Sequence, residues 1–156
     1  MTCDDDVKKL YDDLLAAWNR RDASGMARLY VADGLQIGFD GSHMSGAAEI
    51  EAHLAPIFAN HPTGKFVGVV RSVHELSDEV ALLHAHAGML PAGKHDIKPE
   101  LNAVQALVAK RADGAWRVAL FQNTPAAFHG RPAAAENLSA ELRQASRTMG
   151  LNAEGL

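Results

Sequence analysis

The segment from Asn102 to Arg131 constrains the fold most, because it has the pattern of two long β-strands joined by a tight turn. Asp113-Gly114 supplies the turn, since both residues tolerate the positive φ angles of a two-residue hairpin. Pairing outward from this turn places Gln105 opposite Gln122 on one face. Both faces of the hairpin are largely apolar, so we expect helices of the same chain to cover one and a second subunit to cover the other.

The spacing of apolar residues changes from helical to alternating along the chain. The expected elements are helices over residues 2–21, 22–34 and 45–58, a short hairpin over 35–44, strands over 66–76 and 80–90, the central hairpin, and a terminal helix over 132–149. Helices followed by strands indicate an α+β fold, with three N-terminal helices packed on a curved antiparallel sheet. We expect one domain over residues 1–132, and a C-terminal helix or flexible tail over 133–156.

Composition narrows the classes of partner. The net charge is −4 and no basic stripe is present, so we expect neither nucleic acid nor a membrane as a partner. Cys3 is the only cysteine, which rules out a disulfide within the chain and favours the reducing cytoplasm. No apolar run is long enough to span a bilayer.

His84 and His86 are the candidate catalytic residues. They lie two apart on one expected strand and therefore share a face, where a histidine can act as a general acid or base. The alternative is an exposed sheet face or a dimer contact. A metal site would need a third ligand, and Arg71, expected opposite His84, would repel a cation, so we expect no metal.

Polar groups on the central hairpin are candidates for ligand binding, together with two polar-tipped aromatic residues near helix ends. These candidates are Asn102, Gln105, Gln122, Asn123, Trp18 and Tyr30. The amides can orient a carbonyl or hydroxyl group of a ligand, or they can pair with each other to satisfy buried strands. The two aromatic residues can line a pocket or belong to the core.

Two groups of motifs resemble the NTF2-like superfamily, which includes the SnoaL-type polyketide cyclases and the ketosteroid isomerases. The first is Leu15-Ala16-Ala17-Trp18-Asn19-Arg20-Arg21-Asp22, followed by Leu29-Tyr30-Val31-Ala32-Asp33-Gly34. The second is Gln122-Asn123-Thr124-Pro125 with His129-Gly130-Arg131-Pro132, which resembles the SgcJ/EcaC group in particular. The resemblance implies a cone-shaped fold, usually dimeric, with an apolar internal cavity. It further implies a polyketide or polyene ligand of the kind found in enediyne biosynthesis.

The catalytic groups of the ketosteroid isomerases do not carry over onto this sequence. The position of their helix tyrosine falls at Leu14, and that of their aspartate base falls at Gly38. No acid lies between residues 101 and 112, where their second acid would be. We therefore expect no steroid-isomerase chemistry by that mechanism.

The sequence thus predicts a cytoplasmic homodimer that binds a hydrophobic small molecule in the cone. Acid/base or cyclase-like catalysis would need no cofactor, because no phosphate-binding glycine motif is present. The alternative is a non-catalytic NTF2-like module for dimerisation or assembly. The two differ in whether the cavity is open or filled by side chains.

Overall fold

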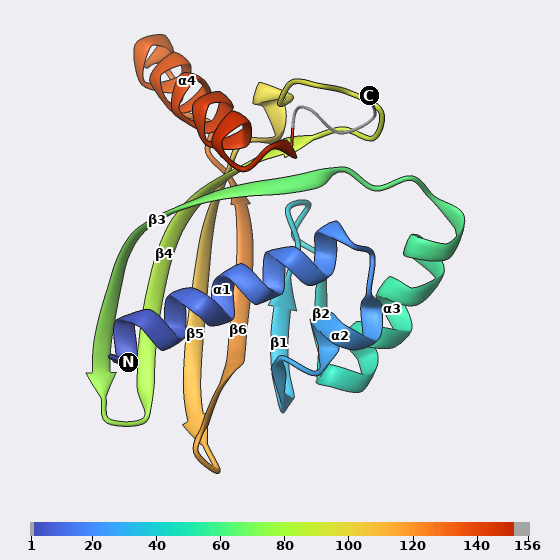
Figure 1. The fold of residues 1–156 in the computed structure, drawn as a ribbon, viewed down its shortest axis with the longest axis vertical. Coiled ribbons are helices and arrows are strands. Elements are labelled where there is room, and N and C mark those ends of the chain that lie inside the picture. Colours follow the sequence, from blue (N-terminus) through green and yellow to red (C-terminus); the bar gives the residue numbers. More distant parts are fainter. Residues whose placement is uncertain (1, 152–156) are drawn as a thin grey trace.

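The computed structural model describes residues 2–151, which form four α-helices, a short 3-10 helix and one six-stranded sheet (Figure 1). The helices are α1 (Cys3–Asn19), α2 (Ala23–Ala27), α3 (Ala47–Asn60) and α4 (Pro132–Thr148), with the 3-10 helix η1 at Pro99–Leu101. The strands are β1 (Tyr30–Ile37), β2 (His43–Ser45), β3 (Lys65–Ser77), β4 (Val80–Leu90), β5 (Ala103–Ala112) and β6 (Ala115–Pro125). They are ordered β2-β1-β6-β5-β4-β3 across the sheet.

The expected α+β arrangement is confirmed. In Figure 1, α1 crosses the sheet, α2 and α3 lie beside β1 and β2, and α4 lies at the end of the sheet where β4 finishes. We call the face that packs against α1 the inner face and the opposite one the outer face. Of the two alternatives for residues 133–156, the structure has the helix, α4, over Pro132–Thr148, whereas residues 152–156 lie outside the described part of the chain.

The first strand differs from the sequence expectation in two ways. It begins at Tyr30, inside the region expected to be helical up to Gly34, and it runs parallel to β6 in a sheet expected to be antiparallel. The pairing of β1 with β6 slips between Tyr30 and Leu35. A Cβ atom on Gly34 would lie 2.9 Å from both the Tyr30 ring and the Val118 carbonyl oxygen. This glycine therefore permits close strand packing and does not end a helix.

The central hairpin turns where the sequence predicts. Asp113 and Gly114 have φ angles of 52° and 78°, as a tight hairpin turn requires. The register beyond the turn is different, because a bulge at Ala119 inserts one extra residue into β6. Gln105 consequently pairs with Asn123, and the prediction that it faces Gln122 is wrong.

Two apolar clusters hold the elements together. The larger one fills the space between the inner face and helices α1, α2 and α3, with Leu14, Leu54 and Leu107 among its buried members. The smaller one attaches α4 to the outer face, where Leu138 and Leu142 pack with Val67. No helix within residues 2–151 is both long enough and apolar enough to cross a membrane.

Candidate functional site

A chain of buried side-chain hydrogen bonds crosses the inner face from α1 to β6. The Tyr11 hydroxyl donates to Oε1 of Gln105 over 2.6 Å. Nε2 of Gln105 then donates to Oδ1 of Asn123 over 3.2 Å. Gln105 has no exposed surface, whereas Asn123 is half-buried. The chain therefore begins in the core and ends at a partly exposed amide.

Small residues on β3 and β4 make room for these buried hydrogen bonds. A Cβ atom on Gly68 would lie 2.4 Å from the Tyr11 hydroxyl oxygen, so only glycine on β3 lets the phenol reach this depth. Ala85 of β4 pairs with Gln105 and is itself fully buried. The phenol of Tyr11 thus lies between α1 and strands that carry almost no side-chain bulk at this level.

The direction of the hydrogen bonds determines which group the chain offers to a ligand. Burial raises the pKa of Tyr11 well above its ordinary range, so the phenol stays protonated and donates. Gln105 accepts at its oxygen and donates through its nitrogen, which makes the Asn123 oxygen an acceptor. The Asn123 NH2 group is therefore the donor end of the chain, and each bond polarises the next.

Sequence reasoning missed Tyr11. The position assigned to a phenol on α1 was Leu14, which is a buried core residue. Tyr11 lies three residues earlier on the same face of the helix, and its hydroxyl reaches β5. The spacing of three residues between Tyr11 and Leu14 indicates that both lie on one face of α1, and this pattern could have identified Tyr11 as a candidate.

Of the two aromatic candidates, Tyr30 lies in the larger apolar cluster and Trp18 packs against it. Trp18 donates from Nε1 to the Gly64 carbonyl over 2.9 Å, and its ring packs 5.2 Å from Phe58. Tyr30 is 3% exposed and donates to Oε1 of Gln36 over 2.8 Å. Both side chains have their polar tips satisfied inside the protein.

The other two amide candidates take no part in the Tyr11–Gln105–Asn123 hydrogen bonds. Nδ2 of Asn102 donates to Oγ of Ser139 over 3.0 Å, which ties the start of β5 to α4. Its Oδ1 is buried and has no hydrogen-bond partner among the described residues. Gln122 pairs with Ala106 and Ile37 on the outer face.

The two histidines also lie on the outer face. Arg71 donates from Nε to Nδ1 of His86 over 2.8 Å and forms a two-point ion pair with Glu141 of α4, at 2.6 and 2.7 Å. Because a guanidinium can only donate, Nδ1 of His86 carries no proton. Burial, followed by the charge of Arg71, lowers the pKa of His86 below its usual value of 6.5. The rings of His84 and His86 are 5.3 Å apart.

The sheet therefore divides the candidate residues into two sets. Gln105 and Asn123 share the inner face with Tyr11, while His84, His86 and Gln122 occupy the outer face. The Phe128 ring stacks on the His86 ring, with the centroids 6.4 Å apart. The backbone φ angle of Phe128 is 47°, which is unusual for a bulky residue. Within residues 2–151, no three His, Cys, Asp or Glu side chains are grouped so that they could hold a metal ion.

The sequence of residues 7–123 matches the family model described as the SnoaL-like domain. The chain belongs to the SnoaL-like domain family. No curated protein matches the sequence of this SnoaL-like protein.

Solved structures show that the SnoaL-like chain has the NTF2-like, or cystatin-like, fold. A Nostoc punctiforme domain of unknown function with a cystatin-like fold is 20% identical at a TM-score of 0.76, covering 96% of this chain and 93% of the other. An NTF-2 like protein of unknown function from Shewanella oneidensis is 19% identical at 0.64, covering 77% and 97%. A ketosteroid isomerase-like protein from Erwinia carotovora is 16% identical at 0.62, covering 78% and 95%.

Proposed function

We propose that this SnoaL-like protein binds a hydrophobic small molecule and engages a carbonyl or hydroxyl group of that molecule with Asn123. The observation that carries the proposal is the direction of the Tyr11–Gln105–Asn123 chain. Its donor end is the one member with exposed surface, while its buried members are satisfied by each other. A ligand oxygen would accept from the Asn123 amide and extend the chain.

The chemistry available to such a site is polarisation of a carbonyl group. Amide and phenol donors stabilise negative charge on oxygen, which is the requirement for enolisation and for cyclisation of a polyketide. No carboxylate or imidazole is found among the polar residues buried in the described part of the chain. Binding with carbonyl polarisation is therefore the function that we favour. A role for His84 or His86 would require a ligand on the outer face.

Our proposal for the class of ligand rests on the resemblance to the SgcJ/EcaC group. That resemblance favours a polyketide or polyene intermediate, such as those of enediyne biosynthesis. Leu107 and Phe121, in the row next to the amides, are buried in the larger apolar cluster. Such a molecule would therefore lie at the partly exposed end of the inner face, beside Asn123. A conjugated carbonyl would supply the oxygen that the Asn123 donor requires.

A matched pair of probes tests this function. The aromatic ketone 1-tetralone and the hydrocarbon tetralin share one ring framework and differ by the carbonyl group. We expect tryptophan fluorescence to show tighter binding of the ketone, by roughly 5- to 10-fold for one hydrogen bond. Asn123→Leu should remove the difference, whereas Asn137→Leu on the exposed side of α4 should keep it. Equal affinity of the wild type for both probes would contradict the proposal.

The outer face supports assembly as a homodimer, which we propose as the state in which the protein acts. Leu82, Val108, Leu120 and Leu35 are paired in register across four strands and form one apolar row. All four side chains keep exposed surface in the single chain. Covering this row with the same row of a second subunit would remove apolar surface from water. Assembly without ligand binding is the alternative function, and it predicts that neither probe binds.

A further inference from the structure

We propose that Gln36 is a second ligand-binding residue beside Asn123, and that the ligand has two oxygen acceptors, as in a diketone or a hydroxy ketone. The inference rests on the function proposed for Asn123 and specifies the class of molecule that the same site binds. Gln36 lies on β1, the neighbour in the sheet of β6, which carries Asn123. Sequence reasoning missed this residue, as it missed Tyr11.

A buried hydrogen bond orients the Gln36 amide. The Tyr30 hydroxyl donates to Oε1 of Gln36 over 2.8 Å. Burial raises the pKa of Tyr30 well above its ordinary range, so the phenol stays protonated and remains a donor. Because Oε1 accepts this bond, the NH2 group of Gln36 is the end of the pair that can donate to another molecule.

The NH2 group of Gln36 is available to a ligand although the residue as a whole is only 7% exposed. Within residues 2–151, its Nε2 makes no hydrogen bond to the protein. Nε2 is also not among the described side-chain atoms that are both buried and unpaired. This nitrogen therefore keeps contact with solvent, and a molecule that replaces the solvent there gains a donor that is already oriented.

The Tyr30–Gln36 pair repeats the arrangement of Tyr11 and Gln105. In both pairs a buried phenol donates to the side-chain oxygen of a glutamine. Each phenol also depends on a glycine, and for Tyr30 this is Gly34, where a Cβ atom would lie 2.9 Å from the ring. A buried polar pair adds little net stability over apolar residues of the same shape. The repetition therefore points to a role for the amide groups that the phenols orient.

Strand register brings the two amide donors to neighbouring positions on the inner face. Gln36 pairs with Phe121 of the parallel strand β6, and Asn123 lies two residues beyond Phe121 on the same face. With strands about 4.8 Å apart and a rise of about 3.3 Å per residue, the Cα atoms of Gln36 and Asn123 lie roughly 8 Å apart. Side chains at this diagonal spacing are within reach of one small molecule.

The end of the inner face leaves room beside these donors. Gly38 directly follows β1, and continuing the register by one residue places it next to Asn123. Among the described residues, a Cβ atom on Gly38 would have within 4 Å only atoms of Asp40 and Ser42, at 3.4 and 3.6 Å. Both belong to the connection between β1 and β2. No atom of β6 or α1 comes this close, so a ligand can approach the two amides here.

The two amides determine which chemical groups the ligand must provide. The side-chain oxygens of Gln36 and Asn123 each accept a bond inside the protein, from Tyr30 and Gln105 respectively. What both residues offer outward is an NH2 group, which can only donate. The ligand must therefore present an oxygen acceptor to each of them. A cyclic 1,3-diketone meets this requirement in one small and otherwise apolar molecule.

The test is an NMR titration of the ¹⁵N-labelled protein, in which the side-chain NH2 signals of Gln36 and Asn123 report the two hydrogen bonds directly. The probes are 2,2-dimethyl-1,3-indanedione and 2,2-dimethyl-1-indanone, which share one ring framework, form no enol and differ by one carbonyl group. We expect the diketone to shift both NH2 signals in a saturable manner. The monoketone should bind more weakly by roughly 5- to 10-fold, as expected for the loss of one hydrogen bond.

Substitutions connect this preference to Gln36. Gln36→Leu should lower the preference for the diketone to about 2-fold, the factor that remains because either of two equal carbonyls can face Asn123. This change leaves the Tyr30 hydroxyl without its acceptor, so Tyr30→Phe combined with Gln36→Leu removes both polar groups and should show the same loss in a folded protein. Gln144→Leu on the exposed side of α4 is the matched control and should keep the wild-type preference.

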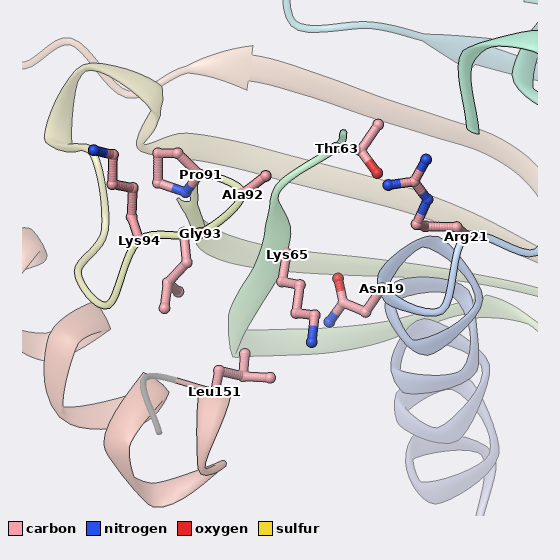
Figure 2. A pocket seen from close by; sticks show the side chains of 10 residues that line it. Asn19, Arg21, Thr63, Lys65, Pro91, Ala92, Gly93, Lys94 and Leu151 are labelled. Carbon is pink, nitrogen blue, oxygen red and sulfur yellow. The ribbon is translucent and has the colours of Figure 1, made fainter. Parts of the chain in front are cut away.

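The outcomes separate this inference from the function on which it rests. A wild type that prefers the diketone by no more than about 2-fold, or a Gln36→Leu variant with an unchanged preference, would overturn the role of Gln36 and leave the role of Asn123 intact. Two other results would contradict both proposals. One is that neither ketone binds more tightly than the hydrocarbon 2,2-dimethylindane. The other is that shifts are confined to the hollow at the C-terminal end of α1, which Thr63 and Gly93 line (Figure 2).

Discussion

Tyr11 and Gln105 join α1 to the middle of the sheet through a buried hydrogen bond of 2.6 Å. Gln105 has no exposed surface and Tyr11 has none either, so water cannot replace either partner. The pair therefore has two consequences. It fixes the position of α1 over the inner face. It also sets the donor-to-acceptor direction of the hydrogen bonds that run from Tyr11 through Gln105 to Asn123.

Removal of the Tyr11 hydroxyl should destabilise the protein. Tyr11→Phe leaves the buried Oε1 of Gln105 without its donor, which we expect to lower the free energy of unfolding by about 1–3 kcal/mol. Urea denaturation of Tyr11→Phe, Gln105→Leu and the double variant would measure the coupling. The double variant should be less destabilised than the sum of the single changes, because both polar partners are then absent. Additive effects would show that the bond contributes nothing.

The stability of variants at position 21 should reflect the left-handed backbone conformation of Arg21. Since its φ angle is 61°, Arg21→Gly should be more stable than Arg21→Ala by about 1 kcal/mol, because glycine adopts this conformation without strain. Both variants lose the same contacts with the end of α3, so their difference isolates the backbone. Thermal unfolding of the two proteins provides the measurement. An alanine variant as stable as the glycine variant would contradict the left-handed assignment.

The stability of the protein should fall as the pH drops below about 6.5, the ordinary pKa of histidine. Burial and Arg71 lower the pKa of His86, so the unfolded chain takes up a proton at a higher pH than the folded protein does. The stabilisation is complete above this pH and is lost as the pH falls towards the folded-state pKa. Near His86 lie Arg71, His84 and Glu141, and the Glu141 carboxylate partly offsets the effect.

His86→Gln tests this pH dependence. The variant keeps an oxygen that can accept from Arg71 but cannot titrate, so its unfolding free energy should change less between pH 6.5 and pH 5 than that of the wild type. Urea denaturation at a series of pH values would provide the two slopes. Identical slopes would show that His86 does not contribute.

Val108 should control the proposed dimer. It lies within the apolar row of the outer face, between Leu82 and Leu120. Val108→Glu would place a charge in the buried interface, and we expect a monomer in sedimentation velocity with an unchanged circular dichroism spectrum. Ala52→Glu on the exposed side of α3 is the control and should remain dimeric. A folded Val108→Glu dimer would show that another surface mediates assembly.

The sequence identified the order of the elements and the turn at Asp113-Gly114, because apolar periodicity and turn chemistry are local signals. It failed to predict the bulge at Ala119, which moves Gln122 to the face opposite Gln105. A slip of one residue normally exposes apolar side chains to water. In this hairpin both faces are apolar, so the pattern contained no information about the register.

The sequence was also insufficient to predict how Tyr11, Gln105 and Asn123 come together. The amides of Gln105 and Asn123 were recognisable as candidates, since polar groups in apolar strands need partners. That Tyr11 reaches Gln105 depends on the missing side chain of Gly68, a contact between α1 and an edge strand distant in sequence. The separation of the histidines from the amides likewise follows from strand register.

Native mass spectrometry of the purified protein, before and after exposure to an extract of the producing cell, tests whether the protein binds a small molecule through Asn123. We expect the wild type to retain a mass of a few hundred daltons, Asn123→Leu to lose it and Asn137→Leu to keep it. The same spectra report the number of subunits. A wild-type protein that retains nothing from any extract, or an Asn123→Leu variant that retains the same mass, would contradict the proposal that Asn123 is the group that binds the ligand.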